Sequence, residues 1–193
     1  GSGCVSENGA ELKALGSRAM IVTGKHSSRI NGSLAAVEQA LQANGQTYVI
    51  FDEIEENPSV ETVAVAAGIA VKEQVDFFVA VGGGSAIDTA KAVSIVLANG
   101  GQVKDYEGVG KSRKPGIPIV AVNTTAGTGS EVTSFYIVTD SDTHSKMCMV
   151  DTNCMVTIAV DDADFMMTMP KGLTASTGMD AMTHAVEAVV AKR

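Results

Sequence analysis

In FFVAVGGGSAID, residues 77–88, an unbroken apolar run ends directly in three glycines, and this succession is the strongest indication of the fold. An apolar run without alternation predicts a strand that is buried on both faces. Helical spacing after Ser85 predicts a helix that reaches about Leu97. A strand, a glycine turn and a helix in direct succession are typical of α/β proteins.

The same alternation precedes this stretch. Apolar runs at 19–23 and 47–51 predict two more buried strands, and helical periodicity predicts a helix over 31–43. The segment Asn57-Pro58-Ser59 is expected to start a second helix, with Pro58 near its first turn. Right-handed crossovers between these parallel strands give a Rossmann-like, doubly wound α/β fold.

The pattern changes after Asn99. Residues 99–116 are expected to form a connector, 117–122 another buried strand, and 134–160 short strands around the polar turn 140–142. A long helix is predicted over 171–191, with a break at Gly178 left open. Its apolar face has no later segment in this sequence to pack on, so we expect a fragment of a larger protein.

Composition narrows the class of protein. The chain has 193 residues, 45% of them hydrophobic, and a formal net charge of -8 without a basic stripe, which argues against nucleic acid as a partner. No apolar stretch is long enough to span a membrane, and no signal peptide is visible. Cys4, Cys148 and Cys154 have no metal-like spacing and are expected to be free thiols, which favours a cytoplasmic protein.

Two glycine-containing segments suit a phosphate. Gly82-Gly83-Gly84-Ser85 opens a helix, whose free N–H groups and dipole attract anions. The segment TTAGTGSE, residues 124–131, is rich in hydroxyls and follows a strand, at the edge where open α/β sheets bind ligands. Taken alone, the first is equally a tight turn and the second an ordinary loop.

A third polar segment follows the first predicted strand. Residues 23–29, TGKHSSR, offer a glycine, two serines and two cations, all able to serve a phosphate. An acidic residue at such an edge would instead bind ribose hydroxyls and repel a 2′-phosphate. The alternative is an ordinary polar loop between a strand and a helix.

Asp180 and His184 are the candidate metal ligands. Four residues apart, they share one face of the predicted last helix. A carboxylate and an imidazole together suit Fe²⁺ or Zn²⁺. Two ligands do not complete a site, and an ion pair on the helix surface is the competing interpretation.

Three motifs together resemble one family. GGGSxxDxxK (82–91), TTAGTGSEVT (124–133) and GMDAMTHAVE (178–187) stand in the order and spacing of iron-containing (group III) alcohol dehydrogenases. The first motif is also found in glycerol dehydrogenases and dehydroquinate synthases, whereas the other two are specific to the family. The resemblance implies a dinucleotide-binding domain over 1–168, with 169–193 as the first helix of an all-helical metal-binding domain.

The resemblance also implies the site. Gly83, Gly84, Ser85 and Asp88 would contact the pyrophosphate and nearby groups, and Asp180 and His184 would be the first two of four metal ligands. Thr124, Thr125 and Thr128 would line the adenosine and phosphate side of the cofactor. Lys146 would reach the ribose, and Asn57 matches a position near the cofactor.

The form of the cofactor is predicted from Gly24. Many members of the family that use NAD carry Asp at this position, so Gly24 with Ser27 and Ser28 favours NADP(H) over NAD(H). The implied activity is hydride transfer between this cofactor and a small primary alcohol or aldehyde at a divalent metal, in an intact enzyme expected to be a homo-oligomer. The fragment alone is expected to be inactive.

Two rival functions remain at this stage. A dehydroquinate synthase-like lyase also uses NAD, although the 124–131 segment argues against it. A non-catalytic nucleotide-binding module would bind the cofactor without turning over an alcohol.

Overall fold

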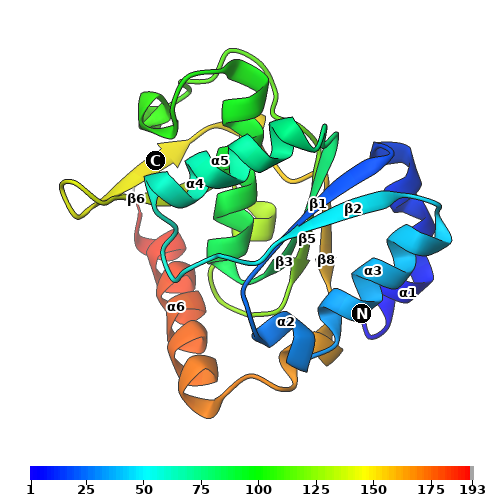
Figure 1. Ribbon diagram of the computed structural model, residues 1–193. Coiled ribbons are helices and arrows are strands. Elements are labelled where there is room, and N and C mark those ends of the chain that lie inside the picture. Colours follow the sequence, from blue (N-terminus) through cyan, green and yellow to red (C-terminus); the bar gives the residue numbers. More distant parts are fainter. Residues whose placement is uncertain (192–193) are drawn as a thin grey trace.

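The central sheet confirms the predicted Rossmann-like, doubly wound fold (Figure 1). The computed structural model describes residues 1–191. Five parallel strands lie in the order β2-β1-β3-β5-β8, and the direction of strand addition reverses between β1 and β3. Ligands bind to such sheets at the carboxyl ends of the strands beside this reversal. The strands are β1 (Arg18–Thr23), β2 (Thr47–Phe51), β3 (Phe77–Gly82), β5 (Ile119–Asn123) and β8 (Ile158–Asp161).

Helices cover both faces of this sheet (Figure 1). One hydrophobic cluster joins α4 (Val60–Lys72) and α5 (Gly84–Asn99) to one face of the strands. A second joins α1 (Cys4–Asn8), the 3₁₀ helix η1 (Gly9–Leu15) and α3 (Ser33–Ala43) to the other face. Every residue of β3 is buried, because both of its faces lie under helices.

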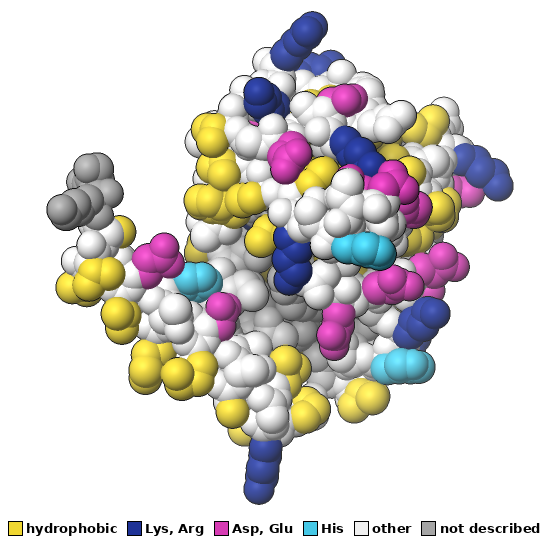
Figure 2. All heavy atoms as spheres, turned by 90° about the vertical axis from the view of Figure 1, so that its left-hand side faces the viewer, with side chains coloured by type: hydrophobic (Ala, Val, Ile, Leu, Met, Phe, Trp, Pro, Cys, Tyr) yellow, Lys and Arg dark blue, Asp and Glu magenta, His cyan; other side chains and the backbone are white. Residues whose placement is uncertain are grey.

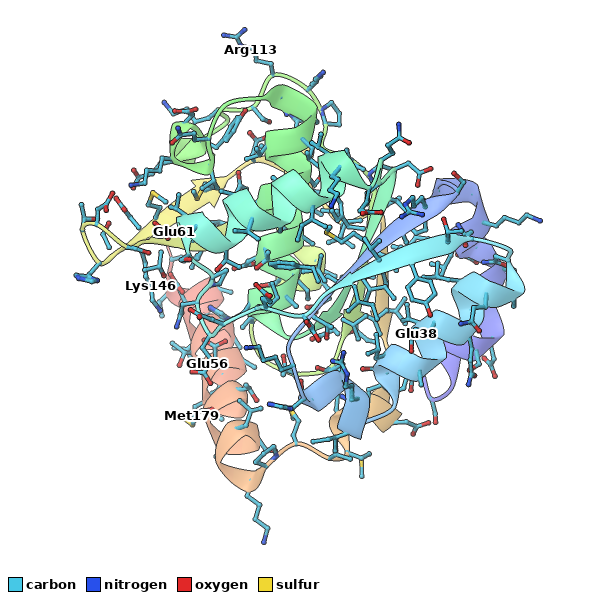
Figure 3. The ribbon with its side chains drawn as sticks, in the orientation of Figure 1. Glu38, Glu56, Glu61, Arg113, Lys146 and Met179 are labelled. Carbon is cyan, nitrogen blue, oxygen red and sulfur yellow. The ribbon has the colours of Figure 1, made fainter. Side chains whose placement is uncertain are left out.

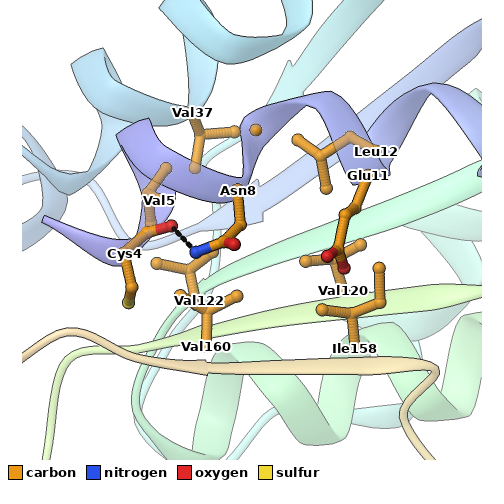
Figure 4. A pocket seen from close by; sticks show the side chains of 11 residues that line it. Cys4, Val5, Asn8, Glu11, Leu12, Val37, Val120, Val122, Ile158 and Val160 are labelled. Carbon is orange, nitrogen blue, oxygen red and sulfur yellow. Dashed lines mark hydrogen bonds between the residues drawn. The ribbon is translucent and has the colours of Figure 1, made fainter. Parts of the chain in front are cut away.

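The second face contains a small apolar cavity between α1, η1, β5 and β8 (Figure 4). It has a volume of about 30 Å³ and is lined mainly by aliphatic side chains such as Leu12, Val122 and Ile158. Apart from Cys4 and Glu11 its lining carries no titratable group.

A smaller sheet lies beside α5. It consists of β4 (Gly108–Val109), β7 (Ser145–Val150) and β6 (Phe135–Asp140), and β6 and β7 form an antiparallel hairpin. Tyr136, Val138 and Met149 pack into the same core as α5. The connector expected over 99–116 therefore contains β4 and the 3₁₀ helix η2 (Val103–Tyr106).

The start of α4 agrees with the prediction. Ser59 is the N-cap and the helix begins at Val60, so Pro58 lies just before the first turn. The Ser59 side chain accepts a hydrogen bond from the Thr62 N–H, which satisfies one of the donors at the helix start. Asn57 has a φ of 57°, in the left-handed region that Asn tolerates.

The last helix, α6 (Lys171–Val190), runs without a break through Gly178. None of its residues is buried, and Met179, Met182 and Val186 are exposed on its surface. Residues 192–193, which complete the second predicted domain segment, lie outside the described residues. Among the residues described, no helix combines the length and the apolar character that a membrane crossing requires.

Candidate cofactor and metal site

A single large cleft brings the three sequence motifs together. It has a volume of about 750 Å³ and lies between the start of α5, the loop 127–130, β6 and α6. Figure 2 shows this face of the molecule hollowed between α6 and the rest of the molecule. The predicted residues that line it are Asn57, Gly84, Ser85, Asp88, Thr128, Asp180 and His184.

The glycine turn offers unblocked backbone donors at the floor of the cleft. Gly83 is the N-cap of α5, and no side chain caps this helix. The first N–H groups of a helix have no partner inside the helix, and here they lie beside the strand reversal. This arrangement fits a phosphate, because the donors and the helix dipole act in the same direction.

The turn packs against the threonine-rich loop. A Cβ at Gly83 would lie 2.8 Å from Oγ1 of Thr125, and one at Gly84 would lie 3.2 Å from Oγ1 of Thr128. Thr124 is buried and its N–H donates to the Gly82 carbonyl at 3.0 Å, which ties the end of β5 to the end of β3. Glycine at 83 and 84 therefore allows the two motifs to pack this closely.

Asp88 presents a buried carboxylate with one free atom. Its Oδ2 accepts from the Ile137 N–H at 3.0 Å, whereas Oδ1 is buried and has no hydrogen-bond partner among the described residues. Burial raises the pKa of Asp88 to about 6, opposed by the Ile137 N–H and by the charge of Lys91. Because unpaired buried acceptors are costly, Oδ1 is suited to accept from a bound molecule.

Lys91 was not among the predicted site residues, although it closes the first motif. It is fully buried, and its Nζ donates to the carbonyls of Ser130, Thr133 and Phe135 at 2.6, 2.7 and 2.7 Å. Burial lowers the pKa of its ammonium. One ammonium thereby holds the segment 130–135, which forms a wall of the cleft, against α5. The first motif already included Lys91, but the role of this lysine could be recognised only from its tertiary contacts.

Asp180 and His184 face the cleft from α6. Nε2 of His184 lies 4.0 Å from Oδ1 of Asp180, and their side chains are 53% and 42% exposed. The donor set fits a divalent cation of the Fe²⁺ or Zn²⁺ type. No cluster of three or more metal-ligating side chains occurs within residues 1–191, so these two groups would hold only part of the coordination sphere.

The remaining predicted residues lie outside the cleft lining. Gly24 and Ser27 follow the end of β1, where Gly24 is opposite Gly82 in register. Ser28 is fully buried and its Oγ accepts from the Thr23 hydroxyl at 2.8 Å, so in this conformation it does not reach a ligand. Lys146 is exposed on β7 (Figure 3), on the same face of the hairpin as Ile137, which lines the cleft.

Sequence reasoning also missed the far wall of the cleft. Phe135, Ile137 and Glu187 line it, although none belongs to the predicted set. The alternation of β6, with Tyr136 and Val138 inside, leaves Phe135 and Ile137 on the opposite face. Glu187 follows His184 by three residues, so the helix places it on the same side.

These features define an α/β protein with an uncapped glycine turn at its strand reversal, facing a carboxylate–imidazole pair across one cleft. The sequence profile of the family described as iron-containing alcohol dehydrogenase matches residues 1–163. The chain belongs to this family.

Named relatives agree with this assignment. The chain is 42% identical to alcohol dehydrogenase 4 of Schizosaccharomyces pombe, covering 98% of this chain and 45% of that protein. It is also 42% identical to the NAD-dependent methanol dehydrogenase of Bacillus methanolicus, covering 100% and 50%. Among solved structures, 1,3-propanediol oxidoreductase superposes with a TM-score of 0.95 at 38% identity, covering 100% of this chain and 50% of that one. The chain thus spans about half the length of these relatives.

Proposed function

We propose that this chain is the nucleotide-binding part of an oxidoreductase that transfers a hydride between a nicotinamide dinucleotide and a small primary alcohol or aldehyde. The observation that carries the proposal is the shared cleft, in which the uncapped start of α5 lies across from Asp180 and His184. Relatives described as alcohol, methanol and 1,3-propanediol dehydrogenases and as lactaldehyde reductase support the substrate class.

Each group in the cleft has a role in this proposal. The amides that follow Gly83 would bind the pyrophosphate, with Ser85, Thr124, Thr125 and Thr128 around it. Oδ1 of Asp88 would accept a hydrogen bond from the same ligand, and Asn57 and Lys146 would border it. Asp180 and His184 would hold a divalent cation, Fe²⁺ or Zn²⁺, whose chemistry is the polarisation of an alcohol or aldehyde oxygen. The protein would supply orientation and charge, while the cofactor supplies the hydride.

We further propose NADP(H) as the preferred form over NAD(H). A Cβ at Gly24 would meet nothing within 4 Å, so the end of β1 leaves open space for a 2′-phosphate. The named relatives include an NAD-dependent methanol dehydrogenase and an NADH-dependent butanol dehydrogenase, so the preference depends on this local observation.

The test is a calorimetric titration of the 193-residue chain with NADP⁺ and with NAD⁺. Binding of either dinucleotide, with tighter binding of NADP⁺, is expected. Absence of binding by both would refute the proposal, and tighter binding of NAD⁺ would refute the preference.

A second candidate function is a nucleotide-binding module without catalysis. It is favoured by the metal ligands, because the described residues provide two and not a complete set. Titration followed by an assay of alcohol-dependent reduction of the bound cofactor, with Zn²⁺ or Fe²⁺ added, distinguishes the two. We expect binding without turnover from this chain alone and turnover from a homo-oligomeric, cytoplasmic enzyme that has the full family length.

A further inference from the structure

An ion pair lies beside the end of β1, outside the cleft described above. Nη2 of Arg29, in the short helix α2 (Ser27–Ile30), lies 2.9 Å from Oδ2 of Asp52. Nη1 of Arg29 also donates to the carbonyl of Lys25 at 3.1 Å. The guanidinium is therefore held between the loop that follows β1 and the residue that follows β2. The two side chains are 43% and 39% exposed, so both remain accessible from solvent.

The strand register fixes where this pair lies relative to the glycine turn. Val22 pairs with Phe51, so Asp52 adjoins the end of β1 on one side. Thr23 pairs with Val81, so the glycines that follow β3 adjoin it on the other side. Neighbouring strands are about 4.8 Å apart. A nucleotide whose phosphate binds at the start of α5 would thus extend its ribose over Gly24 toward Arg29 and Asp52.

The charges around this position oppose one another. Lys25 and Arg29 attract a phosphate, whereas Asp52 and the exposed Glu53, Glu55 and Glu56 repel it. Without a ligand, Asp52 occupies one edge of the guanidinium. A phosphate dianion is a stronger partner than a carboxylate for the same donors, because it brings more charge and three oxygens.

On the basis of the proposed function, we infer that the Arg29–Asp52 ion pair sets the preference between NADP(H) and NAD(H). Arg29 binds the 2′-phosphate, and Asp52 competes with the phosphate for Arg29. NAD(H) has a neutral 2′-hydroxyl in place of the phosphate, so the affinity of the chain for NAD(H) depends much less on the Arg29–Asp52 pair. Gly24 provides the space for the 2′-phosphate, and the Arg29–Asp52 pair determines how strongly the site prefers NADP(H) over NAD(H).

The test compares the ratio of the NADP⁺ to the NAD⁺ binding constant in variants of the 193-residue chain. Asp52→Asn is expected to raise the ratio about fivefold, and Arg29→Gln to lower it about fivefold, the size of one exposed charge interaction. In the double variant the ratio is expected to match that of Arg29→Gln, because Asp52 acts only through Arg29.

A matched control exists at the opposite edge of the sheet. Arg18 at the start of β1 forms an ion pair with Glu73, and both side chains are about as exposed as the Arg29–Asp52 pair. Arg18→Gln is expected to leave the ratio unchanged. Equal ratios in the native chain and in both Asp52→Asn and Arg29→Gln would overturn the inference. Loss of binding of both dinucleotides by the native chain would instead overturn the proposed function.

Discussion

Gly127 lies directly against Thr177 of α6. A Cβ at Gly127 would be 2.7 Å from the Thr177 carbonyl oxygen and 3.1 Å from its Cα. The loop that borders the glycine turn therefore touches the helix that carries Asp180 and His184, about one turn before Asp180 and about two turns before His184. Since α6 has no buried residue, this contact is one of the few that set the position of the candidate metal ligands.

Gly127→Ala is expected to displace α6. The added methyl group would collide with backbone atoms, which cannot move as a flexible side chain can. Faster amide hydrogen exchange over residues 177–187 is expected, measured by mass spectrometry. Gly172→Ala is the control, because a Cβ there meets nothing within 4 Å. Equal exchange in the two variants would show that the Gly127 contact does not position the helix.

Gly83→Ala is expected to weaken dinucleotide binding. Its Cβ would lie 2.8 Å from Oγ1 and 3.0 Å from Cγ2 of Thr125. To relieve this clash, either the glycine turn or the loop that carries Thr125 must shift, and the backbone amides would then point away from the phosphate. The loss of one charge-assisted hydrogen bond lowers the dinucleotide affinity by about tenfold. Calorimetric titration measures this effect.

Gly68→Ala is the matched control for that experiment. Gly68 lies within α4 and a Cβ there meets nothing within 4 Å. This variant should keep its dinucleotide affinity and gain roughly 0.5–1 kcal/mol in the free energy of unfolding, since alanine favours a helix over glycine. Unchanged affinity in Gly83→Ala would argue against a phosphate at the glycine turn.

His184→Ala is expected to weaken Zn²⁺ binding by the chain. The imidazole is one of two ligands on this face of α6, and even the loss of an outer partner of a metal ligand costs about tenfold or more in affinity. Isothermal titration with Zn²⁺ is the measurement. His144→Ala changes an exposed histidine between β6 and β7 and should have no effect. Equal affinity in both variants would assign the bound zinc to another place.

Asp88 is expected to make stability depend on pH. Burial raises its pKa from 3.8 to about 6, so the folded chain holds the proton more tightly than the unfolded chain. Its contribution to stability is complete below about pH 3.8 and is lost as the pH rises through about 6. Relative to the native chain, Asp88→Asn should therefore gain roughly 2 kcal/mol between pH 4 and pH 8, because each pKa unit corresponds to about 1.4 kcal/mol.

Urea unfolding at these two pH values measures the difference. The exposed Glu11→Gln variant controls for a general effect of removing one negative charge. If Asp88→Asn differs from the native chain by the same amount at both values, the carboxylate does not titrate in this range.

Elements whose causes are local could be predicted from the amino-acid sequence. The run 77–81 is apolar throughout and Gly82–Gly84 follow at once, so the strand, the turn and the start of α5 could be predicted without any distant contact. Helical spacing likewise placed Asp180 and His184 on one face. The motifs identified the family, because their order and spacing are properties of the chain alone.

The contacts between distant side chains, in contrast, depend on how the whole chain folds. The parallel register brings residues distant in the chain to one sheet edge, so Arg29 finds Asp52 there, and folding turns the Ser28 hydroxyl toward Thr23 and the interior. Lys91 holds the segment 130–135 because its ammonium is buried and donates hydrogen bonds to three carbonyls of that segment. Burial and strand pairing depend on the whole chain, and no local pattern encodes them.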